Sequence, residues 1–428
     1  MTWGSILLIN IFTLIFITIL VYKNKKKFFS FYNFFLIWYW IVMFMGIPLT
    51  YILSSNFNFL RINIELINQM QLYSIFFILI FIMVYKIPLK YPKIILFPKM
   101  NYKELQVLSF IFILLSSISI LYFLSKNGLL ILTSTSYEER YSSNLGLGIL
   151  TRFFPFFIAG LVISFFLKPT YKRWKRNITL GIILGLLTYM VMGGYRQIIA
   201  IHIFVFLILG YHYSFIKLKT IIRIGVISIP LLMFMALFRY GINSSSELGF
   251  NFLIFTMDTF SPYDSFVKII EYYNNHQEEK FQGFSIIVNE FSSLIPRAIW
   301  TSKPELVLNA GNFYTQEILK YNANVTISPT ILGSLFLING VFAIFFGALF
   351  LGLTLKWFDK KMYYTSIVSI REKGNFHNVL YSVFYYYILF YVPTIAREGI
   401  EVFFQRVVMA YIIFITFIFL SKIIIRKN

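Results

Sequence analysis

The segment from Pro329 to Lys361 reads PTILGSLFLINGVFAIFFGALFLGLTLKWFDKK. Its first part, residues 329–355, contains no charged side chain, and a helix needs about 20 apolar residues to cross the hydrocarbon core of a bilayer. Lys356, Lys360 and Lys361 follow directly. An apolar run of this length with a basic end is typical of a transmembrane helix whose basic end faces the cytoplasm.

The chain contains ten other apolar runs of similar length. In chain order the eleven runs are 4–22, 28–53, 66–85, 104–124, 149–167, 177–193, 198–216, 221–238, 329–355, 377–393 and 404–420. Hydrophobic residues make up 58% of the sequence and charged residues 13%, and the mean hydropathy is +0.75, which excludes a soluble domain of this size. We predict an all-α polytopic membrane protein with about eleven transmembrane helices, forming one membrane domain over residues 1–428.

Positive charge is concentrated at one set of helix ends. Six connections hold 25 of the 38 Lys and Arg residues: 23–27, 86–103, 168–176, 217–223, 356–373 and 421–428. Because basic loops stay in the cytoplasm, this alternation predicts an N-terminus outside and a C-terminus inside. The first run has no basic segment before it and one after it, which predicts a retained anchor and not a cleaved signal peptide.

Charge and composition also exclude several classes of function. The net charge is +21, but the basic residues lie in short turns beside apolar runs, so we expect contact with membrane lipid and no nucleic-acid binding. The absence of cysteine excludes thiol catalysis, disulfides and cysteine-ligated zinc. The predicted outer side has no cluster of His and Asp, and the chain has no phosphate-binding glycine loop, so we expect no metal site and no cofactor.

One outer connection, residues 239–328, is much longer than the others, and a loop of that length is usually functional or has structure of its own. In Ser261-Pro262-Tyr263-Asp264 we expect a serine cap, a proline in the first helical turn and an acidic first turn. An amphipathic helix to about Asn275 and a second helix over 284–294 are predicted to lie on the membrane surface.

Six arginines lie at the predicted outer ends of helices or in the outer loop: Arg152, Arg196, Arg239, Arg297, Arg397 and Arg406. A guanidinium offers five donors in a fork that fits phosphate, so together they predict a pocket for a lipid-linked pyrophosphate. The alternative is snorkelling or a structural ion pair, for instance with Glu398 or Glu401. We assign Arg196, Arg239 and Arg297 to catalysis, and Arg152, Arg397 and Arg406 to substrate binding.

Local sequence makes some positions rigid. Gly193 and Gly194 allow a tight reversal before Arg196, beside a helix N-terminus that itself favours anions, and prolines flank a segment with Arg297, Trp300 and Lys303. The seven outer carboxylates that are candidates for the general base are Asp258, Asp264, Glu271, Glu290, Glu305, Glu398 and Glu401; we assign Asp264 and Glu290 as catalytic. In the ninth run, glycines at 333, 340 and 347 predict a close-packing stripe.

Four short motifs carry a resemblance to a known family. They are Gly193-Gly194-Tyr195-Arg196, Arg239-Tyr240-Gly241, Pro296-Arg297-Ala298-Ile299-Trp300 with Lys303-Pro304, and Ser328-Pro329-Thr330-Ile331-Leu332-Gly333 leading to Asn339-Gly340. In order and topology they resemble the Wzy-type oligosaccharide repeat unit polymerases, the O-antigen polymerases. Where many relatives carry an acidic residue after the Leu-Gly pair, this chain has Ser334.

The resemblance implies a lipid-carrier-dependent (GT-C-like) helical fold in the bacterial cytoplasmic (inner) membrane, with an active site that faces the periplasm. It implies the transfer of a growing glycan from undecaprenyl pyrophosphate to the next lipid-linked repeat unit, without metal or nucleotide sugar. Tyr195, Tyr240, Trp300 and Lys303 would help to bind substrate. Expected partners are the lipid-linked oligosaccharides, a chain-length regulator and a flippase. The product would be O-antigen of lipopolysaccharide or capsule.

Three other functions stay open on sequence grounds. An O-antigen ligase-like glycosyltransferase shares the fold and the donor but uses another acceptor. A lipid-linked oligosaccharide flippase or transporter carries out no chemistry, and it typically has charges near mid-membrane and repeated halves. Here the charges lie near the helix ends and the two halves of the chain do not repeat. A membrane acyltransferase is disfavoured because no histidine has an evident catalytic partner.

The alternation of charge generates a direct test of topology. A reporter fused after Lys27, Lys103 or Arg176 should read as cytoplasmic, and one at His276 should read as external. Alkaline phosphatase and green fluorescent protein fusions at these four points measure this. An external signal at Arg176 would contradict the alternation and the placement of every outer residue named above.

Overall fold

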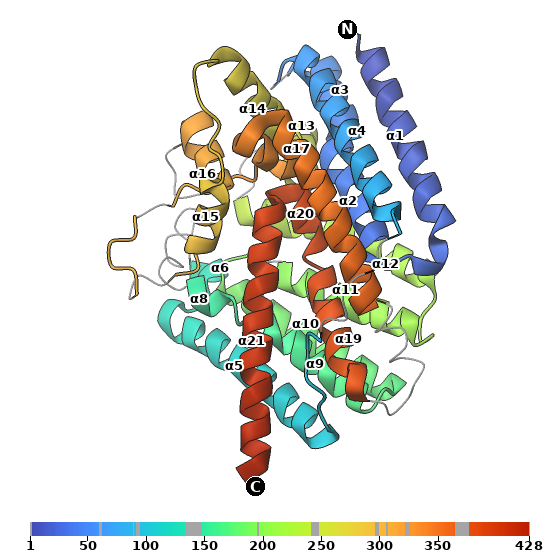
Figure 1. Ribbon diagram of the computed structural model, residues 1–428, viewed down its shortest axis with the longest axis vertical. Coiled ribbons are helices and arrows are strands. Elements are labelled where there is room, and N and C mark those ends of the chain that lie inside the picture. Colours follow the sequence, from blue (N-terminus) through green and yellow to red (C-terminus); the bar gives the residue numbers. More distant parts are fainter. Residues whose placement is uncertain are drawn as a thin grey trace. The chain divides into compact units, whose positions relative to one another are not determined.

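The computed structural model describes residues 2–59, 62–88, 90, 95–133, 148–194, 197–240, 248–295, 299–304, 307–321, 326–363 and 376–427. Every regular element in this part of the chain is helical (Figure 1). The predicted all-α class is therefore confirmed. The chain divides into two compact units, which are described in turn: unit 1 comprises Met1–Pro92, Ser244–Asp359 and Tyr391–Val408, and unit 2 comprises Lys93–Asn243, Lys360–Phe390 and Met409–Asn428. The single membrane domain stays a prediction.

Unit 1 contains the first helices of the chain together with the helices of the long predicted outer loop and its surroundings. They are α1 (Trp3–Lys23), the short turn η1 (Lys25–Lys27), α2 (Phe31–Phe44), α3 (Gly46–Phe57), α4 (Ile64–Lys86), α13 (Leu248–Phe260), α14 (Asp264–Asn275), α15 (Ser285–Ser292), α16 (Ala310–Phe313), the π-helical turn η3 (Tyr314–Ile318), α17 (Thr330–Phe358) and α20 (Val392–Glu398). The first residues of α21 (Ile400–Lys427) also belong to this unit.

Unit 2 contains most of the middle of the chain. Its elements are α5 (Tyr102–Asn127), α6 (Leu130–Thr133), α8 (Gly148–Thr151), α9 (Phe156–Leu167), α10 (Tyr171–Val191), α11 (Gln197–His212), α12 (Leu218–Tyr240), the π-helical turn η4 (Asp359–Tyr363), η5 (Phe376–Asn378), α19 (Val379–Leu389) and the rest of α21. Helices α5 and α9 pack together, as do α10 and α11.

Each of the eleven predicted apolar runs coincides with helix. Among the described residues, seven helical segments are long and apolar enough to cross a membrane, and two shorter apolar helices, α9 and α11, come in addition. Helices α10 and α12 cover the remaining two runs. A multi-pass helical membrane protein follows from this, whereas the count of eleven spans stays a prediction.

The second apolar run is bent between α2 and α3, and the bend explains an error in the prediction for Ser261. The Ser261 hydroxyl donates to the Val42 carbonyl (2.8 Å) and accepts from the Gly46 amide (2.8 Å). Helix α14 begins at Asp264, and its N-cap Tyr263 makes no side-chain cap hydrogen bond. The predicted serine cap is therefore wrong, because tertiary hydrogen bonds at the bend occupy the hydroxyl. The two predicted loop helices are present as α14 and α15.

Helix α17 is interrupted near its middle. Asn339 (φ −163°, ψ 49°) and Gly340 (φ 53°, ψ −138°) have non-helical backbone angles. The half before the break is buried on all sides from Thr330 to Ile338, whereas helices at a protein surface bury one stripe. Residues 341–358 continue as the second half and pack against α4, beside which α17 lies in Figure 1.

The loop segment before α15 supplies the hydrogen bonds that the break removes. The amides of Gln282 and Gly283 donate to the carbonyls of Leu337 (2.8 Å) and Ile338 (3.0 Å), which have no partner within an interrupted helix. The ring of Phe281 lies so close to Gly340 that an added Cβ would be 2.9 Å from it. The predicted stripe of three glycines is therefore wrong for Gly340, because this glycine ends a helix segment and does not pack along a straight one.

The other end of α17 is also fixed by a polar contact. The buried carboxylate of Asp359 accepts from the amides of Phe31 (2.8 Å) and Tyr32 (3.1 Å) and from the hydroxyl of Tyr85 (2.7 Å). These amides are the first of α2 and lack partners within their own helix, and a negative charge at a helix N-terminus is stabilised by its dipole. One carboxylate thereby joins α2, α4 and α17.

The break generates a prediction for stability. Gly340→Ala places a Cβ at positive φ against the Phe281 ring, so it should lower the free energy of unfolding by about 1–3 kcal/mol. Thermal unfolding in detergent measures this. Gly225→Ala, in α12 with nothing within 4 Å, is the matched control and should be neutral or slightly stabilising. Equal thermal midpoints for the two variants would contradict the assigned role of Gly340.

Candidate functional site

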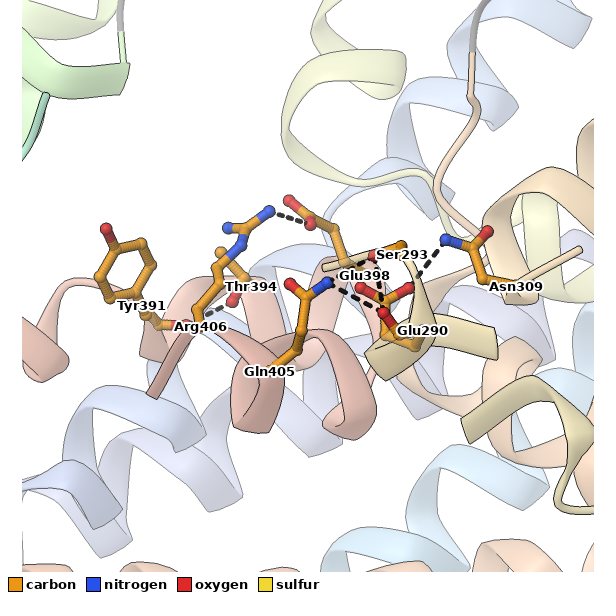
Figure 2. A network of polar contacts seen from close by, with 8 residues as sticks. All are labelled: Glu290, Ser293, Asn309, Tyr391, Thr394, Glu398, Gln405 and Arg406. Carbon is orange, nitrogen blue, oxygen red and sulfur yellow. Dashed lines mark hydrogen bonds and ion pairs between the residues drawn. The ribbon is translucent and has the colours of Figure 1, made fainter. Parts of the chain in front are cut away.

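A network of polar side chains surrounds α15 (Figure 2). At its centre is Glu290, which is 5% exposed and whose Oε2 accepts from the Asn309 amide nitrogen (2.8 Å). From α21, Gln405 Nε2 donates to the Glu290 backbone carbonyl (3.0 Å) and to the Ser293 hydroxyl (2.8 Å). A buried carboxylate requires donors. Asn309 donates to the carboxylate itself, and Gln405 binds the backbone of the same residue.

The next residue of α21 is Arg406, whose guanidinium points toward Glu398 in Figure 2. It forms an ion pair with Glu398 at the end of α20 and lies over the ring of Tyr391, 5.7 Å from its centroid. The structure thus contains the ion pair with Glu398 that the sequence analysis named for this arginine; its predicted part in substrate binding stays a prediction. The pair and the ring hold the guanidinium in one orientation.

A second buried carboxylate, Glu401, lies one helical turn before Gln405. Its Oε1 accepts from the hydroxyl of Ser334 at 2.6 Å, a length typical of a hydroxyl donating to a carboxylate. Ser334 is fully buried in the first half of α17, and Glu401 is 5% exposed. At the position where the resemblance implies an acidic residue, the carboxylate therefore comes from another helix.

Glu401 lies within electrostatic reach of two other carboxyl groups, those of Glu290 and Glu398. Like charges in a poorly solvated place repel one another strongly. Arg406 offsets the charge of Glu398, while Asn309 and Ser334 donate to the other two carboxylates. The arrangement can therefore hold a carboxylate as a proton acceptor beside an oriented guanidinium.

Lys303, a predicted substrate-binding residue, contacts the end of α15. Its ammonium donates to the carbonyls of Ser293 (2.8 Å), Ile295 (2.9 Å) and Ser292 (3.3 Å), which are acceptors that the helix leaves unpaired. The Trp300 ring lies 6.0 Å from the ammonium, and its indole donates to Ser302 (3.1 Å). These contacts support a structural part for Lys303.

Arg397 has a similar environment at another helix end. Its guanidinium donates to the carbonyls of Thr259 (2.8 Å) and Asp258 (3.3 Å), in the last turn of α13. Asp264, a predicted base, is buried in the first turn of α14. Of the predicted site residues in unit 1, the structure brings Glu290, Trp300, Lys303 and Arg406 to the surroundings of α15.

Some of the remaining predicted residues lie in the described part of the chain, and the others lie outside it. Gly193 (φ 68°) and Gly194 (φ 105°) form the predicted tight turn between α10 and α11, and Arg152 lies in a turn just after α8 in unit 2. Tyr195, Arg196 and Arg297 lie outside the described residues, as does the candidate base Glu305, and so do the side chains of Arg239 and Tyr240 at the end of α12. Among the described residues, no group of three His, Asp or Glu could hold a metal ion.

Sequence reasoning missed Asn309, Gln405 and the contact between Ser334 and Glu401. Gln405 had a usable signal, since a polar side chain inside an apolar helix is costly unless it has a partner. Asn309 had none, because amides are common in outer loops.

A family model described as "WzyE protein, O-antigen assembly polymerase" matches residues 1–426. No solved structure matches the chain.

The contact between Ser334 and Glu401 generates a prediction for stability. Ser334→Ala leaves the buried carboxylate without this donor, and a hydrogen bond to a charged group contributes about 1.5–3 kcal/mol. The thermal midpoint in detergent should fall accordingly, whereas Ser125→Ala, at an exposed serine of α5, should leave it unchanged. An unaltered midpoint in Ser334→Ala would mean that the contact contributes no net stability.

Proposed function

Because this chain belongs to the WzyE family of O-antigen assembly polymerases, we propose that it joins undecaprenyl-pyrophosphate-linked repeat units into a surface polysaccharide. The family match over residues 1–426 carries the proposal. The enzyme acts at the outer face of the bacterial cytoplasmic membrane, where both lipid-linked substrates present their diphosphates at the same depth. Eleven spans with the N-terminus outside bring the loop between α12 and α17 to that face.

Glu290 is the general base of this reaction. Its carboxylate accepts a hydrogen bond from Asn309 and its helix is held by Gln405, which supports a fixed proton acceptor. The carboxylate lies among half-buried polar residues, Asn309, Glu398 and Arg406, so a sugar hydroxyl has polar surroundings to approach. Asp264, the other predicted base, starts a helix, where a carboxylate is stabilised by the dipole without any part in chemistry.

Arg196, Arg239 and Arg297 bind the diphosphate of the donor, together with Arg152 and Arg406. The fork of a guanidinium fits diphosphate oxygens, and Arg196 gains from the N-terminus of α11 directly after it. Tyr195, Tyr240 and Trp300 contact the sugars. Lys303 and Arg397 support the site through the helix ends that they contact.

The chemistry is one substitution at the anomeric carbon of the growing chain. A hydroxyl of the incoming repeat unit attacks this carbon and forms the new glycosidic bond, and its proton passes to Glu290. The bond from the anomeric carbon to the pyrophosphate oxygen breaks, and its electron pair leaves with undecaprenyl pyrophosphate. Negative charge grows on that leaving group, so fixed guanidinium groups aimed at it lower the barrier.

Deletion of the gene in its host tests the function. Without the polymerase the final acceptor should carry single repeat units, seen as one band in place of a ladder on a polysaccharide gel. A loss of all surface glycan with repeat units trapped on the inner leaflet would instead indicate a flippase. If the final acceptor carried no glycan while long chains were still made on the lipid carrier, the protein would be a ligase.

Complementation of the deletion strain with variants tests the residues. Alanine at Arg196, Arg239 or Arg297 should abolish the ladder at normal protein levels. Lysine keeps the charge but loses the fork, so it should restore only part of the chain length. Lys268→Ala, at a half-buried position of α14, and Lys280→Ala, at an exposed position of the loop after it, are controls and should keep full ladders. Wild-type ladders with both Arg196→Ala and Arg297→Ala would contradict the diphosphate pocket.

A further inference from the structure

The carboxylate of the proposed base, Glu290, accepts from the side chain of Asn309, and the orientation of that side chain is determined by a second contact. Asn309 is the N-cap of α16, and its Oδ1 accepts from the backbone amide of Asn312 at 2.9 Å. A backbone amide can only donate, so the oxygen of the Asn309 side chain must face it. The amide nitrogen therefore faces Glu290 Oε2, at 2.8 Å, and donates to it.

The segment that carries Asn309 is itself cross-linked. Asn312 donates from Nδ2 to the Val307 carbonyl (2.8 Å) and accepts at Oδ1 from the Thr326 hydroxyl (2.6 Å). On α15, Asn289 donates to the Leu308 carbonyl (2.9 Å). The side chain of Asn309 therefore has little freedom, and the segment that carries it also binds α15, the helix of Glu290. Active-site groups are kept in position by such supporting contacts.

The charges around Glu290 make this donor important. Glu401 on α21 lies within electrostatic reach of the carboxyl groups of Glu290 and Glu398, and Arg406 is paired with Glu398. Negative neighbours favour the protonated form of a carboxylic acid, and a donor to the carboxylate favours the charged form. Only the charged form can accept a proton from a sugar hydroxyl.

We propose that Asn309 is the positioning residue of the general base: its amide keeps Glu290 charged and aimed at the acceptor hydroxyl. This rests on the proposed polymerase function with Glu290 as base. Asn309 acts through Glu290 and takes no proton itself. Nothing in its sequence surroundings marks it for this role, which depends on the double hydrogen bonding of one amide.

Two substitutions at position 309 separate the two roles of the Asn309 side chain, the N-cap of α16 and the donor to Glu290. Serine and aspartate at position 309 both keep an N-cap oxygen, which helices favour as strongly as asparagine. Serine removes the donor to Glu290, and aspartate replaces it with a negative charge. Asn63→Ser is the matched control, because Asn63 caps α4 through the Glu65 amide (2.9 Å) at an exposed position.

The experiment uses purified full-length enzyme in vesicles with lipid-linked repeat units, and rates are given per folded molecule. Asn309→Ser should lower kcat by about tenfold with an unchanged KM. The pH below which kcat falls should rise by about one unit, because a carboxylate that loses a donor is protonated at higher pH. Asn309→Asp should lower kcat further and move the profile further in the same direction. Asn63→Ser should match the wild type in all three quantities.

The outcomes distinguish this inference from the proposed function. A wild-type kcat and pH profile in Asn309→Ser, or a loss only in the amount of folded protein for both variants, overturns the role of Asn309. Full activity in Glu290→Gln removes the base on which it rests. Failure of the wild-type enzyme to lengthen lipid-linked chains contradicts the polymerase function itself, whatever the variants do.

Discussion

A helix interrupted inside a membrane protein must have its freed backbone groups hydrogen-bonded by another part of the protein, because hydrocarbon offers no partners. In α17 the interruption at Asn339 and Gly340 frees the carbonyls of Leu337 and Ile338, and the amides of Gln282 and Gly283 meet them. Helix α15 begins two residues later, at Ser285. The position of the helix that carries Glu290 therefore depends on the backbone requirement of a distant apolar helix.

The same half of α17 is under constraint at both ends. It begins at Thr330, a β-branched residue with φ 67°, and it ends at Gly340 with φ 53°. Such backbone angles persist only where the surroundings hold them, and they are frequent near functional sites. Between these ends the half-helix presents Ser334 to Glu401 on α21, and Gln405, one turn further along α21, holds α15. Local strain and the polar network thus belong to one connected part of unit 1.

The helices were predictable from the sequence because long apolar runs admit few other structures in a membrane. The amphipathic pattern of the outer loop likewise predicted α14 and α15. The break in α17 was not predictable, since glycines seven residues apart give the same pattern in a straight helix, and the loop amides that permit the break are remote in sequence. The cap at Ser261 failed for a related reason, because Val42 and Gly46 compete for the hydroxyl. In the site, Glu290 was identifiable as an outer carboxylate, but its partner Asn309 was identifiable only from the fold.

The basic residues show why residue type alone does not distinguish substrate-binding side chains from structural ones. The end of a helix and a diphosphate both offer closely spaced acceptor oxygens, so a cation suited to one is suited to the other. Lys303 and Arg397 meet helix carbonyls, and Arg406 meets a carboxylate, although all three looked alike in the sequence. A buried carboxylate is more informative, because it cannot remain charged without donors, and the residues that supply them then identify how the site is held. In this chain the Glu290 carboxylate accepts from Asn309, and the segment that carries Asn309 also holds α15 through Leu308.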